Sequence, residues 1–340
     1  MHPYKSLPDR AFWARGVAAE HPLAPRDIYQ PKFRLKPTDK IATAGSCFAQ
    51  HVGRQLRSRN FPVLDYEPAP PGLGARANKY GYEMFSARYG NVYTSRQLLQ
   101  LVGEAFGERT VKNWIWTRDG RYFDAFRPAI EPNGLSSDTE VRAHRKQHLE
   151  AVRQVLLDMD VFVFTLGLTE TWAIGDVVFP LAPGVVADGP KAKFLNLSHS
   201  DVLADMQAVL GLLDRVREGR PLRVLLTVSP VPLAATASGQ HVLAATTYSK
   251  AVLRSVAGEL SLGANIDYFP SYELVSSHWS RGVFFDADLR NVNAAGVGVV
   301  MSAFFAAHAA PKPLPGLLDL AGAPSGDVQC EEALLARFGK

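Results

Sequence analysis

The stretch that decides the fold reads Lys40-Ile41-Ala42-Thr43-Ala44-Gly45-Ser46-Cys47-Phe48-Ala49. Its apolar first half ends in a Gly-Ser turn. Residues 47–58 then place Phe48, Val52 and Leu56 four residues apart, which is helical spacing. The order is strand, tight turn and helix, which is the first unit of an α/β fold.

The chain beyond this unit alternates apolar runs with amphipathic segments. Expected strands lie at residues 62–66, 161–164, 223–228 and 266–269, and expected helices at 95–106, 139–159, 200–218, 246–260 and 293–307. Runs that are apolar on both faces are typical of buried parallel strands. The alternation predicts a three-layer α/β/α sandwich with a doubly wound parallel sheet of about five strands. Ligands bind at the carboxyl ends of such strands, here loops 44–47, 165–172, 228–232 and 270–293.

The ends of the chain differ in composition from its middle. We expect residues 1–37, rich in proline and aromatic residues, to wrap the surface of an α/β domain at 38–308. An aromatic insertion at 107–137 indicates a hairpin or a lid. Prolines after residue 310 end the domain, and the tail at 309–340 carries a short expected helix at 328–338.

Composition excludes several classes of protein. The 340 residues are 47% apolar and 21% charged, as in globular proteins, and the net charge of +4 argues against nucleic-acid binding. Cys47 and Cys330 are the only cysteines, so we expect no metal, no cofactor and no disulfide-stapled fold. No apolar run reaches signal-peptide or membrane-spanning length, so we expect a cytoplasmic location; the oligomeric state stays open.

Ser46 is the first candidate for chemistry. A serine at a strand-to-helix turn exposes its hydroxyl near backbone N–H groups, and the helix N-terminus favours a developing oxyanion. The alternative is that Ser46 only caps the helix, which is a common role for serine.

Six motifs carry a family resemblance. They are Gly45-Ser46-Cys47-Phe48-Ala49, Gly90-Asn91-Val92-Tyr93-Thr94, Phe123-Asp124-Ala125-Phe126-Arg127-Pro128, Gly167-Leu168-Thr169-Glu170-Thr171-Trp172, Ser229-Pro230-Val231-Pro232 and Tyr248-Ser249-Lys250. In this order they resemble the GSCFA family over about residues 3–305. That family is similar to the SGNH/GDSL-like hydrolases, which implies a flavodoxin-like, SGNH-type sheet.

The resemblance also implies roles for single residues. Ser46 matches the nucleophile, and its N–H together with Gly90 would form the oxyanion hole. In the SGNH hydrolases an asparagine side chain from a later motif also donates to the oxyanion, but the comparable segment here is Gly167-Leu168-Thr169-Glu170. Asn91 is the candidate to supply this amide donor instead, unless it is only a turn asparagine. Thr169 and Glu170 are candidate substrate contacts, with packing or an ion pair as the plainer alternative for Glu170.

The expected catalytic histidine is missing. The resemblance implies a DxxH motif where this chain has Asp288-Leu289-Arg290-Asn291. Asn291 cannot act as a general base, because its amide does not titrate near neutral pH. The asparagine is an engineered change, or the natural protein has lost hydrolysis, or another residue serves as the base. For the third explanation the candidate is His278, unless it is an ordinary histidine of a surface loop. Cys47 is a weaker alternative nucleophile that we expect to pack inward.

The function implied is that of a serine-dependent esterase or O-acyltransferase acting on an acyl ester, possibly of a surface glycan, through an acyl-enzyme on Ser46. The first alternative is a catalytically silent module that binds an acylated glycan or a partner protein. A metal-dependent phosphoesterase is disfavoured because the sequence has no clustered His/Asp ligand set.

Overall fold

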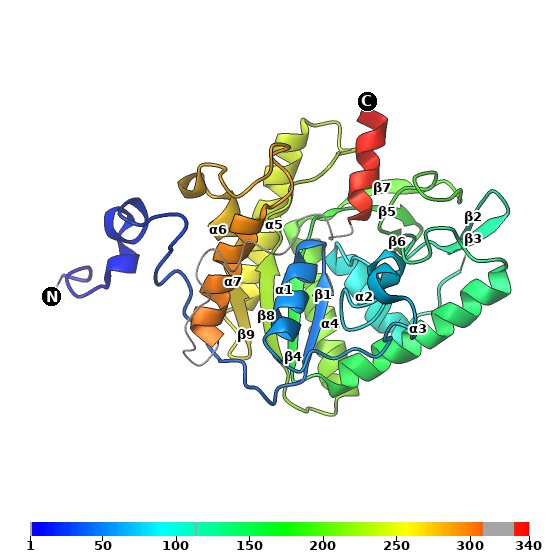
Figure 1. Cartoon of the computed structure of the whole chain (residues 1–340), viewed down its shortest axis with the longest axis horizontal. Coiled ribbons are helices and arrows are strands. Elements are labelled where there is room, and N and C mark those ends of the chain that lie inside the picture. The colour runs from blue at the N-terminus through cyan, green and yellow to red at the C-terminus, as the bar shows by residue number, and fades with distance from the viewer. Residues whose placement is uncertain (1, 113, 309–329, 340) are drawn as a thin grey trace.

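Four parallel strands form the central sheet in the part of the chain that the structure describes, in the order β1-β4-β8-β9 (Figure 1). They are β1 (Ile41–Gly45), β4 (Val161–Leu166), β8 (Arg223–Val228) and β9 (Ile266–Phe269). The structure is a computed structural model that describes residues 2–112, 114–308 and 330–339. Nearly every residue of these strands is buried, which agrees with the runs that are apolar on both faces.

The expected strand at 62–66 is wrong. Only an isolated parallel bridge joins Val63 to Ile41, at the outer edge of β1. The chain then leaves the sheet, because the Tyr66 N–H donates instead to the carbonyl oxygen of Ser86 at 3.1 Å. With this bridge counted as a second strand, the order becomes 2-1-3-4-5, which is the flavodoxin-like order.

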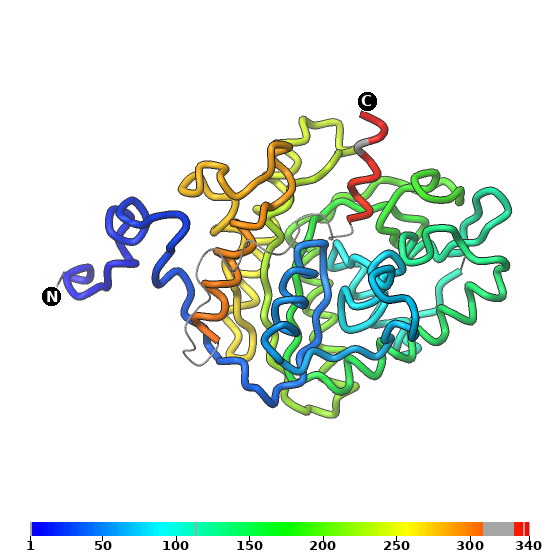
Figure 2. Tube along the Cα trace, viewed as in Figure 1, coloured from blue at the N-terminus to red at the C-terminus, as the bar shows by residue number. Residues whose placement is uncertain are grey.

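Helices cover both faces of the sheet, which confirms the three-layer α/β/α sandwich. One face carries α1 (Phe48–Ser58), α6 (Ser271–Ser276) and α7 (Ala294–His308), and the other carries α2 (Ser95–Ala105), α3 (Asp138–Asp158), α4 (His199–Val216) and α5 (Val242–Leu260) (Figures 1 and 2). Successive strand residues point to opposite layers: Val161 and Val163 face α1 and α7, whereas Phe162 faces the other layer.

Side-chain caps begin α2, α3, α4 and α5, the last through His241. Thr94 and Gln97 form a capping box at α2, and Ser198 forms one with Asp201 at α4. The Ser137 side chain accepts a hydrogen bond from the Glu140 N–H at the start of α3. These side chains explain why the expected helices begin within a few residues of their observed positions.

Two small antiparallel sheets lie beside the main one. The insertion forms a hairpin of β2 (Ile115–Arg118) and β3 (Arg121–Asp124), and a second sheet of β6 (Val177–Phe179), β5 (Glu170–Ile174) and β7 (Lys193–Asn196) was not expected. The rings of Trp116 and Phe126 lie 4.9 and 5.2 Å from that of Phe179. The aromatic residues thus form a core between the two small sheets. The insertion is therefore a packed hairpin and not a free lid.

Short 3₁₀ and π turns complete the described chain. They span Asp9–Ala11, Ala14–Ala18, Gly74–Tyr80 and His278–Ser280, and the C-terminal helix is a 3₁₀ helix at Glu331–Gly339. The first two project from the body in Figure 1, whereas Tyr29 anchors the N-terminal segment through a 2.9 Å hydrogen bond to Asp267. Residues 328 and 329 of the expected C-terminal helix lie outside the described residues. Within those residues, no helix combines the length and the apolar character needed to cross a bilayer.

Candidate active site

Ser46 lies in the turn between β1 and α1, where only glycine fits before it. Gly45 has φ 136°, and a Cβ there would lie 2.4 Å from the carbonyl oxygen of Thr165 on β4. Glycine thus lets β1 end directly against β4. The Ser46 N–H donates to the same oxygen at 3.2 Å, so this N–H takes part in strand pairing, although we expected it to face an oxyanion.

The Ser46 hydroxyl does not cap the helix. The N-cap of α1 is Cys47, with no hydrogen bond from its side chain to the helix. Ser46 is 2% exposed, and among the described residues its Oγ has no hydrogen-bond partner. The buried hydroxyls of Thr43 and Thr165 on the adjoining strands also have no partner among the described residues, so what distinguishes Ser46 is its place in the turn between the end of β1 and the start of α1.

The loop carrying Gly90 and Asn91 lies next to this turn. The Val92 N–H donates to the Gly45 carbonyl oxygen at 2.9 Å, which ties the loop to the end of β1. Gln50, on α1, donates from Nε2 to Asn91 Oδ1 at 3.1 Å. This contact holds the Asn91 oxygen toward α1 and leaves its Nδ2 to face the opposite side, where it donates to Glu331. Asn91 therefore accepts a hydrogen bond on the side of α1 and donates one on the side of the C-terminal helix.

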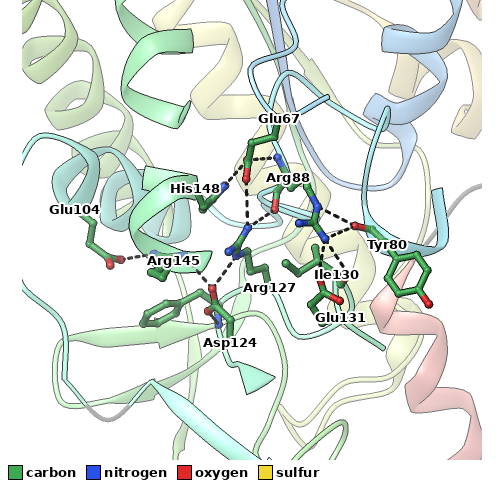
Figure 3. Close-up of polar contacts among 11 residues, drawn as sticks. Glu67, Tyr80, Arg88, Glu104, Asp124, Arg127, Ile130, Glu131, Arg145 and His148 are labelled. Carbon is green, nitrogen blue, oxygen red and sulfur yellow. Dashed lines mark hydrogen bonds and ion pairs between the residues drawn. The ribbon is translucent and has the colours of Figure 1, made fainter. Parts of the chain in front are cut away.

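A network of buried charged side chains holds the backbone just before the Gly90–Asn91 loop (Figure 3). Arg127 donates from Nε to Asp124 Oδ2 at 2.7 Å and from Nη1 to the Arg88 carbonyl oxygen at 3.1 Å. The Arg88 N–H donates to Glu67 Oε2 at 2.6 Å, and His148 Nδ1 lies 2.7 Å from the same oxygen. The motif of residues 123–128 therefore holds the backbone that precedes Gly90.

Gly167, at the carboxyl end of β4, packs against the serine. A Cβ on Gly167 would lie 2.9 Å from Ser46 Cβ and 2.9 Å from the Tyr93 carbonyl oxygen. The Gly167 carbonyl oxygen accepts a 2.5 Å hydrogen bond from Lys250 Nζ. Lys250 is 1% exposed, and burial lowers its pKa to about 8. From the sequence, Lys250 was noted only as part of the Tyr248-Ser249-Lys250 motif, and no role was predicted for it.

Asp288 and Asn291 hydrogen-bond to each other in an exposed turn, and among the described residues no hydrogen bond joins either of them to Ser46. Asn291 Nδ2 donates to Asp288 Oδ2 at 2.6 Å, and the Arg290 and Asn291 N–H groups donate to Asp288 Oδ1 at 2.9 Å each. Burial opposes ionisation of Asp288, but the two N–H donors and Arg290 outweigh it and lower its pKa. Contacts of Arg290 with Glu332 (3.2 Å) and with Cys330 Sγ (3.6 Å) link this turn to the C-terminal helix.

Thr169 and Glu170 occupy different environments. Thr169 is fully buried; its N–H donates to Ser249 Oγ at 2.9 Å and its hydroxyl to Asn196 Oδ1 at 2.6 Å. Glu170 accepts a 2.6 Å hydrogen bond from Thr236, and burial raises its pKa. It lines a cavity of about 190 Å³ beside the C-terminal helix. Of the two, Glu170 is therefore placed to meet a ligand, and Thr169 is held within the protein.

His278 is not brought to the serine. Its ring stacks on Trp13 with centroids 5.3 Å apart, and it lines a cavity of about 750 Å³ between the N-terminal segment and residues 278–283. Cys47 is buried, and its hydrogen bond to Cys330, together with burial, raises its pKa well above the ordinary value. A thiol with a raised pKa is a poor nucleophile, so Ser46 remains the candidate.

Fold and site together define the class of protein: a three-layer α/β/α protein with a buried serine where β1 and β4 end, at the switch point of a flavodoxin-like sheet. The chain belongs to the GSCFA family, whose model matches residues 40–304. No curated protein and no solved structure is similar enough to count as a match.

Proposed function

We propose that this GSCFA-family protein is a serine-dependent esterase or O-acyltransferase that forms an acyl-enzyme on Ser46. The observation that carries the proposal is the Ser46 hydroxyl, which is buried at a helix N-terminus and unpartnered among the described residues. The loop that carries Asn91 is hydrogen-bonded to the same turn through Val92 and Gly45, and Gln50 orients the Asn91 amide as a donor. Nucleophile and oxyanion donor are the two parts that acyl transfer needs most.

In this mechanism, Ser46 Oγ attacks the carbonyl carbon of an ester, and the carbonyl oxygen becomes an oxyanion. Asn91 Nδ2 and the Gly90 N–H would donate to that oxygen. The C–O bond to the alcohol then breaks, the alcohol leaves with a proton, and the acyl group stays on Ser46. Water or an acceptor hydroxyl removes it, which decides between hydrolysis and transfer.

The proton of Ser46 needs an acceptor other than Asn291. Lys250 is the residue best placed to replace the missing histidine, because it binds the carbonyl oxygen of Gly167, which packs on Ser46. A lysine whose pKa burial lowers to about 8 is partly neutral near neutral pH and can then accept a proton. Serine–lysine pairs serve this purpose in other folds.

The substrate class is proposed from the family resemblance. It suggests an O-acyl group on a sugar, such as that of a surface glycan. Glu170 and the neighbouring Trp172 line a cavity where a sugar ring would find a carboxylate and an aromatic face.

Hydrolysis of a chromogenic aryl acetate by the full chain tests the proposal. Ser46→Ala should lower the rate at least tenfold, whereas Ser58→Ala, at an exposed serine on the same helix, should leave it unchanged. Equal rates for the chain and for Ser46→Ala, both alone and combined with Glu331→Ala/Glu332→Ala, which removes the side chains that bind the C-terminal helix to Asn91 and Arg290, would refute a nucleophilic role for Ser46.

A second candidate function is a silent module that binds an acylated glycan. The observation in its favour is Asn291, which makes a hydrogen bond to Asp288 but cannot take a proton. In that case an acetylated oligosaccharide would bind equally to the chain and to Ser46→Ala, with no release of acetate from either.

A further inference from the structure

The C-terminal helix lies over the carboxyl edge of the central sheet, next to β5 and β7, although it is far from both in sequence (Figures 1 and 2). Most of its described side chains are exposed. Leu335 is half-buried, and two acidic residues are buried: Glu331 at 5% and Glu332 at 8% exposure. Burying a carboxylate without a partner costs free energy of folding, so the partners of Glu331 and Glu332 show what the helix is bound to.

Glu331 occupies the candidate oxyanion hole. Its Oε2 accepts hydrogen bonds from Asn91 Nδ2 and, at 2.8 Å, from the Tyr93 hydroxyl. A Cβ on Gly90 would lie 3.3 Å from its Oε1. The carboxylate thus faces both Gly90 and Asn91, the residues that the sequence predicted as oxyanion donors.

Glu332 binds the opposite wall. Its Oε1 accepts from the Ala234 N–H at 3.1 Å, and its Oε2 lies 3.2 Å from Arg290 Nη2. Burial raises the pKa of Glu332 to about 7, while Arg290 and Lys250 act in the opposite direction. One helical turn therefore bridges the Asn91 loop and the turn that carries Asp288 and Asn291.

Cavities remain on both sides of the helix. One of about 190 Å³ is lined by Glu170, Trp172 and Glu332, and one of about 340 Å³ by Arg118, Glu331 and Arg337, among others. The helix thus lies inside a larger cleft and does not fill it. The C-terminal segment meets the serine turn at Cys330, whose thiol is hydrogen-bonded to that of Cys47, and the neighbouring Ser46 is only 2% exposed in this conformation.

We propose that the C-terminal helix is an autoinhibitory plug, in which Glu331 and Glu332 bind the cleft over Ser46 as a tethered acidic ligand. The inference rests on the proposed function, since it assigns regulation to the same site. The carboxylate of Glu331 takes the place of the oxyanion that forms during acyl transfer. Substrate reaches Ser46 only after the helix leaves.

The test measures access to two neighbouring residues in the full chain. Alkylation of Cys47 by a maleimide, mapped by peptide mass spectrometry, reports opening of the cleft whatever Ser46 does. Labelling of Ser46 by a fluorophosphonate reports an activated serine. The variant Glu331→Ala/Glu332→Ala should raise both rates at least tenfold. Ala333→Ser, at an exposed position of the same helix, should change neither.

The outcomes separate this inference from the proposed function. Unchanged alkylation of Cys47 in the double variant overturns the plug, even if Ser46 is labelled. Faster alkylation of Cys47 with no labelling of Ser46 in any variant supports the plug and refutes the esterase.

A peptide added in trans distinguishes an opened cleft from a misfolded variant. The peptide covers residues 330–339 with Cys330→Ser. If the double variant is folded and open, the peptide should slow Cys47 alkylation again. If alkylation stays fast at saturating peptide, the helix does not bind this cleft, and the proposal is wrong.

Discussion

Asn291 Nδ2 donates a 2.6 Å hydrogen bond to Asp288 Oδ2. This is the contact that a histidine ring nitrogen would make with the aspartate of a triad. The two N–H groups that also bind Asp288 hold the carboxylate in place independently of the residue at 291. Asp288 is therefore held in a fixed position, and the residue beside it, Asn291, cannot take a proton.

Asn291→His should add that base. If the esterase proposal is right, the variant should hydrolyse an aryl acetate faster by several orders of magnitude, because losing a triad base can cost about a millionfold. Initial rates at pH 7–8 measure the gain. The same change combined with Ser46→Ala should return the rate to background.

No gain in Asn291→His, with the fold intact by circular dichroism, would mean that the residue at 291 does not reach the serine. Lys250→Arg then becomes the informative variant, because arginine keeps the charge but cannot release its proton. Loss of the residual rate in that variant would support Lys250 as the base.

Gly167→Ala tests the packing between the end of β4 and the serine. The added Cβ would lie 2.9 Å from Ser46 Cβ and from a backbone oxygen of Tyr93, so the serine turn must shift. We expect a loss of about 1–3 kcal/mol in unfolding free energy, as for other overpacked sites, and a lower rate of Ser46 labelling.

The matched control is Gly211→Ala in α4, where, among the described residues and apart from the helix's own backbone and the adjacent residues, no heavy atom lies within 4 Å of the new Cβ. Alanine in a helix should there raise the stability by up to about 1 kcal/mol. Urea unfolding measures both variants. Equal stability and equal labelling for Gly167→Ala and the parent chain would show that the serine turn is not packed as described.

His148 should make the fold sensitive to mild acid. Burial and the nearby Arg127 lower its pKa to about 4, whereas an unfolded histidine titrates near 6.5. Between these values the unfolded chain binds a proton that the folded chain refuses, so stability falls as the pH falls. From pH 7 to pH 5 the chain should lose about 2 kcal/mol more than His148→Gln. If the unfolding free energies of the chain and of His148→Gln fall equally with pH, the proton taken up on unfolding binds to a residue other than His148.

The sequence predicted the layers of this fold better than its edges. Residues 161–164 and 223–228 are apolar on both faces, and such runs have few alternatives to a central parallel strand. Residues 62–66 are less uniformly apolar, since they include Asp65, and they form a single bridge, after which the Tyr66 N–H donates to Ser86. The β5–β6–β7 sheet was missed because its pairing depends on contacts between segments, which no local pattern encodes.

Site residues divide in the same way. The Gly90–Asn91 loop is tied to the turn before Ser46 by the hydrogen bond from Val92 to Gly45, and Asp288 pairs with Asn291; the catalytic roles of these residues stay predictions. Lys250 was missed because a buried lysine in a helix looks like a surface lysine until the fold is known. Glu331 and Glu332 gave no signal, since they lie outside the matched family region of 40–304 and bind it only through tertiary contacts.

Cys47 and Cys330 offer a way to fix the plug in place. They are the only cysteines of the chain, and a hydrogen bond joins their thiols. Diamide should therefore oxidise them to an internal disulfide: the two thiols lose two protons and two electrons, and the diazene is reduced to a hydrazine. Peptide mapping without reductant identifies the linked peptides.

The disulfide should hold the C-terminal helix over Ser46. Fluorophosphonate labelling of Ser46 should then fall at least tenfold and return with dithiothreitol, while Cys330→Ser should not respond to diamide at all. Labelling that persists in the oxidised chain would mean that the helix does not block the serine. Disulfides formed only between two chains would show that the C-terminal segment does not lie beside Cys47 in solution. In both cases the carboxylates of Glu331 and Glu332 would have to be explained without autoinhibition.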